Sequence, residues 1–141
     1  MNNQTSIQQW MLAWSMMTGQ IGQATTFLNK KKHRQALEGY RKEFLLDDYP
    51  SASEDQKNAI HAQWEQFAHM LISSCAKSRS YGSTLFGIVP MKESGVYTKL
   101  AEEIEMVCCT YPKKFGMQKA FEPLYLCMQD VLNTYIDRPL D

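Results

Sequence analysis

His61, Glu65 and His69 are the residues whose types and spacing best suit metal binding. They recur every four residues, so a helix brings them to one side, and imidazole and carboxylate groups so placed can share a metal ion. The pattern is not His-Glu-x-x-His, however, and no fourth ligand is evident. We therefore favour polar residues on the flank of a helix, with Glu65 and His69 paired, over a metal site.

A second candidate is a phosphate-binding loop, because Gly82 and Gly87 have the glycine spacing of such a loop. The Lys and Ser/Thr that should follow are replaced by Ile88 and Val89, and no strand precedes the segment. We interpret the glycines as part of a turn that permits tight packing between helices.

Residues 30–34, Lys-Lys-Lys-His-Arg, form the densest basic run. Nucleic-acid binding through this run is a minor alternative, because it would need a second basic stripe or interleaved aromatic residues. Lys113 and Lys114 are too distant in sequence to show such a stripe. The chain has 15 Lys plus Arg and 15 Asp plus Glu, so it has no basic excess. We expect these cations to suit the C-terminal dipole of the preceding helix.

No group of residues identifies an enzyme. Glu102, Glu103 and Glu105 form an acidic stretch, but paired carboxylates matter only inside a cleft, so we expect a solvated helix face. Serine, histidine and aspartate all occur, yet no pattern places a nucleophile beside a base. We predict no catalytic residue and no cofactor, and a non-enzymatic protein is the favoured interpretation.

The cysteines and the N-terminal residues indicate in which cellular compartment the protein is expected. The cysteines are Cys75, Cys108, Cys109 and Cys127. Their spacing suits neither a disulfide framework nor a zinc site, so reduced and mostly buried thiols are expected. No apolar run approaches 18 residues, and no Lys or Arg precedes the apolar residues 10–17. The sequence therefore predicts a cytoplasmic protein without a signal peptide.

All of these residues are expected to lie on or between helices. Apolar residues recur at steps of three and four, typical of helices, and no stretch alternates with period two. Helices are expected from Thr5 or Ser6 to about 28, at 31–46, from Ser53 to about 78, at 92–110, and after a loop at 111–116. The prediction is an all-α single domain over 1–141, with about five antiparallel helices and one irregular apolar connection at 79–91.

Several local signals set helix ends. Ser53 and Gln56 have the spacing of a capping box. The fourth helix should stop before Pro112, and Pro123 should either sit in the first turn of the last helix or kink it. The positions expected in the core are Trp10, Trp14, Phe44, Trp64, Phe67, Leu71, Leu100, Ile104, Leu124 and Met128.

The first helix gives the strongest indication of function. Its apolar seam runs through Ile7, Trp10, Trp14, Met17, Ile21, Ala24 and Leu28. Leu12 and Met16 form a second apolar strip further round the helix. A bundle of five helices has little room to cover both strips, and an uncovered strip is an apolar patch that monomers rarely expose. We therefore predict a homodimer, a protein-interaction module in which Leu12 and Met16 contact a second chain.

The alternative is a small-molecule-binding protein, with or without activity. A pocket under segment 79–91 would be lined by Trp64, Tyr81, Phe86 and Tyr97. A pocket with convergent polar groups would favour this alternative, whereas an open apolar strip on the first helix would favour self-association. A basic stripe joining 30–34 to 113–114 would favour nucleic acid.

Overall fold

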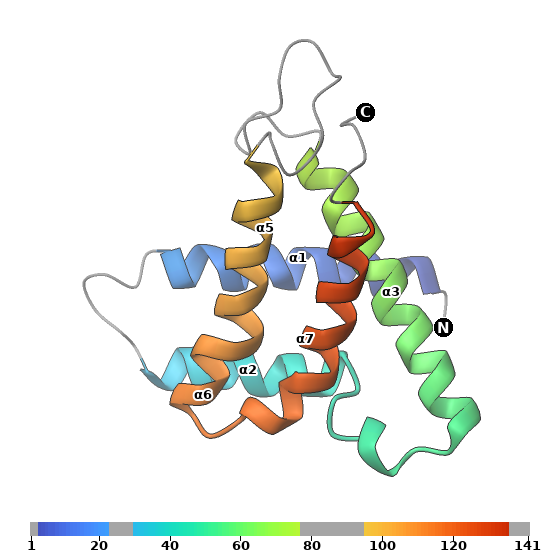
Figure 1. Ribbon diagram of the computed structural model, residues 1–141. Helices are drawn as coiled ribbons and strands as arrows, with labels where there is room; N and C mark the ends of the chain where they lie inside the picture. Colours follow the sequence, from blue (N-terminus) through green and yellow to red (C-terminus); the bar gives the residue numbers. More distant parts are fainter. Residues whose placement is uncertain (1–2, 23–29, 77–94, 136–141) are drawn as a thin grey trace.

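The computed structural model describes residues 3–22, 30–76 and 95–135 (Figure 1). Its helices are α1 (Asn3–Gly22), α2 (Lys30–Glu43), α3 (Glu54–Ala76), α5 (Val96–Glu105), α6 (Tyr111–Lys114) and α7 (Gln118–Asn133), with a 3-10 turn η1 (Tyr49–Ser51) and a π-helical turn η3 (Met106–Thr110). These ranges contain no strand, so the all-α prediction is confirmed. The predicted connection at 79–91 and the seam positions Ala24 and Leu28 lie outside the described residues.

The helices form two crossed layers. In Figure 1, α1 and α2 run in opposite directions behind α3, α5 and α7, with α7 between the other two. Contacts join α1 to α2, α3 and η3, and α7 to α3 and α5. The expected antiparallel packing therefore holds for α1 with α2 and for α5 with α7, but α3 and α7 run in the same direction. Along the chain α5 comes between them and runs in the direction opposite to both, so two reversals give α3 and α7 the same direction.

All ten residues predicted for the core are buried. The ring centroid of Phe67 lies 5.8 Å from those of Trp10 and Trp14 and 5.2 Å from that of Phe44, so α1, α3 and the residue that follows α2 meet in one aromatic cluster. Trp64 is fully buried, and its indole N–H donates to the backbone carbonyl of Phe44 at 2.8 Å. This bond satisfies the one polar atom of the indole, as burial of a tryptophan requires.

The capping box at the start of α3 is confirmed. The backbone N–H of Gln56 donates to Ser53 Oγ at 3.2 Å, and that of Ser53 donates to Gln56 Oε1 at 3.1 Å. The two side chains thus satisfy amides that lack partners inside the helix.

Helix α2 ends earlier than expected, because Leu45 adopts the left-handed conformation (φ 59°). The N–H of Leu46 donates to the Arg41 carbonyl and that of Leu45 to the Lys42 carbonyl, which is the hydrogen-bond pattern of a Schellman motif. The motif turns the Leu46 side chain into the core, where it is 1% exposed.

The prediction that the fourth helix stops before Pro112 is wrong. Proline has no N–H to bond the Cys108 carbonyl in the α-helical register. The chain instead widens into η3, where the Tyr111 N–H donates to the Met106 carbonyl, and continues as α6. Gly116 (φ 71°) then ends α6. Pro123 lies inside α7, past its first turn.

Candidate functional site

The three residues considered as metal ligands, His61, Glu65 and His69, contact protein side chains instead. His61 Nδ1 lies 2.6 Å from Glu65 Oε1, and His69 Nδ1 lies 2.7 Å from the Tyr135 hydroxyl. The expected Glu65–His69 pair is therefore wrong, because Glu65 turns back toward the residue one helical turn before it. The described part of the chain contains no group of three or more His, Cys, Asp or Glu side chains that could hold a metal ion.

Two of the residues predicted to line a ligand pocket have structural roles. Trp64 is covered by the core, and its ring centroid lies 4.7 Å from that of Tyr49. The Tyr97 hydroxyl donates to Asn133 Oδ1 at 2.6 Å and so joins α5 to the end of α7. Tyr81 and Phe86 lie outside the described residues, as does the glycine-spaced segment 82–87.

Helix α1 has one covered and one open apolar strip. Trp10, Trp14 and Met17 of the seam are at most 4% exposed, whereas Leu12 and Met16 are 64% and 59% exposed. Beside Met16, between α1 and α2, lies a hollow of about 170 Å³. It is lined by Ala13, Met16, Met17, Ala36, Gly39, Tyr40 and Glu43. Three of these residues are small, Ala13 on α1 and Ala36 and Gly39 on α2, and small residues on facing helices are the sequence signal that could have indicated the hollow.

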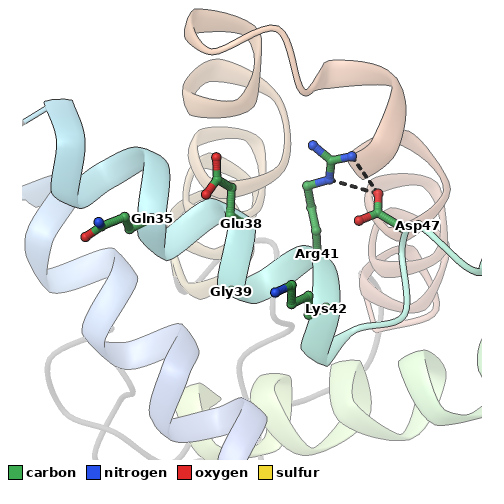
Figure 2. Close-up of a pocket in the computed structure, with 6 residues that line it drawn as sticks. All are labelled: Gln35, Glu38, Gly39, Arg41, Lys42 and Asp47. Carbon is green, nitrogen blue, oxygen red and sulfur yellow. Dashed lines mark hydrogen bonds and ion pairs between the residues drawn. The ribbon is translucent and has the colours of Figure 1, made fainter.

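A larger hollow of about 460 Å³ lies on the polar side of α2 (Figure 2). Its lining residues are Gln35, Glu38, Gly39, Arg41, Lys42 and Asp47. The Arg41 guanidinium donates twice to the Asp47 carboxylate, at 2.9 and 2.6 Å. The other side chains point in different directions, so this surface presents no convergent set of polar groups.

The expectation that the basic run suits the C-terminal dipole of the first helix is wrong. The cations of the run belong to the first turns of α2, at the positive end of the helix dipole rather than the negative end of α1. The His33 and Tyr111 rings lie 5.4 Å apart, and the Arg34 guanidinium carbon lies 5.7 Å from the Phe115 ring. The two basic segments that seemed too distant are therefore adjacent, because α6 packs beside the start of α2.

Polar groups of Trp14, Tyr40 and Glu103 lie close together near the hollow between α1 and α2. Trp14 Nε1 donates to Glu103 Oε1 at 2.5 Å, so this carboxylate does not belong to a fully solvated helix face as expected. The Tyr40 hydroxyl is buried and has no hydrogen-bond partner among the described residues. Burial, then the nearby Cys108, Glu43 and Glu103, raise the pKa of Tyr40 well above its ordinary value. Its phenol is therefore a neutral group near pH 7.

The cysteines have the character that the sequence predicted. All four are free; three are buried and Cys109 is partly exposed. Burial, then the Glu65 and Asp130 carboxylates, raise the pKa of Cys127 to about 12, and burial raises that of Cys108 well above its usual range. Because the thiolate is the nucleophile, neither group is activated for reaction.

The chain is an all-α domain, and its described part exposes an apolar strip on α1 and four cations on α2 and α6. The chain belongs to DUF6553, a family of unknown function whose model matches residues 1–139. No curated protein and no solved structure matches the chain. No described helix is long and apolar enough to cross a membrane.

Proposed function

We propose that this protein is a non-enzymatic interaction module that forms a homodimer through α1. The observation that carries the proposal is the open strip of α1. Leu12 and Met16 lie one helical turn apart and are the two most exposed large apolar side chains of the described chain. Desolvating such side chains against a partner contributes roughly 25 cal/mol for each Å² of apolar surface.

A second copy of the chain is a suitable partner, because this surface has both projecting side chains and a hollow. Leu12 and Met16 project from α1, and the 170 Å³ hollow with Ala13, Ala36 and Gly39 in its wall lies beside them. A two-fold axis places the same patch of both copies in contact, so the projection of one can enter the hollow of the other. The chain has no net charge, so no overall repulsion opposes the approach of two copies.

The test is the molecular mass of the Leu12→Glu/Met16→Glu variant in solution, measured by light scattering over a range of concentrations. The wild type is expected to be a dimer and the variant a folded monomer, because the contact would have to desolvate four carboxylates. The matched control is Met70→Glu/Leu126→Glu, which changes two exposed apolar residues on α3 and α7 and should remain dimeric.

A third variant separates loss of contact from loss of folding. A Cβ atom added at Gly39 would meet nothing within 4 Å, so Gly39→Gln can place a side chain at the wall of the hollow from an unhindered Cβ position. It should be folded by circular dichroism and should weaken the dimer. A wild type that is monomeric at millimolar concentration contradicts the proposal, as does a Leu12→Glu/Met16→Glu variant that unfolds rather than dissociates.

A further inference from the structure

The first turns of α2 and the helix α6 together form a basic surface that the proposed dimer does not use. We define this surface by Lys31, Arg34, Lys113 and Lys114, which are all exposed. Segments 30–37 and 106–121 contain no acidic residue. None of the four cations forms an ion pair with any residue that the structure describes. A chain without net charge therefore concentrates positive charge at one edge.

The position of the α2 cations is unfavourable for the free protein. They lie in the first turns of the helix, where the unbonded backbone N–H groups already carry partial positive charge. An anion bound at this edge would relieve that repulsion and meet lysines from a second helix as well. The cations therefore destabilise the start of α2 in the free protein, and a bound anion would remove this destabilisation.

The surface is held in place by buried aromatic contacts. His33 is 6% exposed and Tyr111 is 6% exposed, and their rings meet edge to face. Lys114 Nζ lies 4.9 Å from the Tyr111 ring, and Arg34 covers the partly exposed Phe115. The contacts with Phe115 and Tyr111 position Arg34 and Lys114, and an aromatic ring does not cancel their positive charges.

We propose that this basic surface binds the phosphate backbone of a single-stranded nucleic acid. Cations drawn from two elements can follow successive phosphates, and the Arg34 guanidinium lies over the partly exposed ring of Phe115 among them. A membrane surface fits less well, because anchoring there needs fully exposed apolar side chains next to the cations, and Phe115 is only partly exposed. The exposed large apolar residues of the described chain belong to α1, α3 and α7, and none of them belongs to the two segments that carry the four cations.

The binding test uses a fluorescently labelled oligouridine at low salt and at rising KCl concentrations. Four cations on a single strand predict that log K falls with log[KCl] with a slope of about −3. Lys113→Gln/Lys114→Gln should weaken binding roughly tenfold and make the slope shallower by about 1.4. The control Lys42→Gln/Lys99→Gln removes the same charge at exposed positions outside both segments and should bind like the wild type.

Histidine NMR signals provide a second readout that does not depend on variants. The chain has three histidines, and only His33 lies beside the basic surface, whereas His61 and His69 are on α3. Oligouridine should shift the His33 ring signals and leave the other two in place. Equal loss of binding in the control variant, the absence of a His33 shift, or equal competition by polyglutamate would overturn the proposal. So would binding to vesicles of anionic lipid without binding to the oligonucleotide.

Discussion

Trp14 of α1 donates its indole N–H to the carboxylate of Glu103 on α5, across 89 positions of sequence. The bond joins α1 to the second layer of helices and places the carboxylate near the Tyr40 hydroxyl, which has no hydrogen-bond partner in the described part of the chain. Trp14 itself is 1% exposed, so its N–H would have no access to water if the carboxylate were absent.

A double-mutant cycle with Trp14→Phe and Glu103→Leu should measure the coupling between these side chains. We expect a coupling free energy of about 1–3 kcal/mol in urea unfolding, because the acceptor is charged and the donor is buried. Glu103→Gln is the control, since its amide oxygen can still accept the bond. Additive effects of the two substitutions would contradict this role.

Ser53→Ala should destabilise the protein by about 0.5–2 kcal/mol, because it removes the oxygen that accepts the Gln56 N–H. Thermal unfolding measures the effect. Ser53→Asp keeps an acceptor and adds a negative charge at the start of α3, so it should keep most of the wild-type stability. If Ser53→Ala and Ser53→Asp have the same midpoint, the capping box contributes nothing measurable.

Substitutions at the two ends of α2 should change stability in opposite directions. Lys31→Glu places a negative charge in the first turn, and we expect a gain of about 0.3–1 kcal/mol at low salt. Lys42→Glu places the same charge in the last turn and should cause a comparable loss. Urea unfolding at low and high salt measures both effects, which salt should screen. A destabilising Lys31→Glu would show that its ammonium has a favourable role in the folded chain.

The protein should lose stability in alkali, starting near pH 9. The pKa of Cys127 rises from 9.0 to about 12 on folding, so the unfolded chain loses this proton first. The contribution is complete below pH 9 and disappears as the pH rises toward 12. The raised pKa values of Cys108 and Tyr40 act in the same direction. The urea midpoint should therefore fall over this range, and less steeply in Cys127→Ala; a midpoint independent of pH would contradict the assignment.

Local sequence patterns were sufficient to predict the helices and the buried residues of the core. The residues that face the interior recur every three or four positions, and this spacing requires only knowledge of helical geometry. For that reason Trp10, Trp64 and Leu124 were correctly placed, and the Ser53–Gln56 capping box was visible as a pattern of near neighbours. The strip formed by Leu12 and Met16 was equally visible.

Chain geometry near prolines and in turns was harder to predict. Pro112 excludes one α-helical hydrogen bond, but the sequence does not say whether the chain stops or widens into a π-helical turn. The packing of α6 beside the start of α2 supports the second outcome here.

The candidate surfaces were decided by tertiary structure. Lys113 is separated from Arg34 by 79 positions, and only the packing of helices brings their elements together. Glu103 and Trp14 meet for the same reason, although one belongs to an acidic stretch and the other to an apolar seam. Periodicity fixes which face of a helix is buried, whereas the crossing of two helix layers depends on how side chains of distant segments interlock. The sequence by itself therefore determined the helices and their inward faces, and the tertiary structure determined which outward faces lie together.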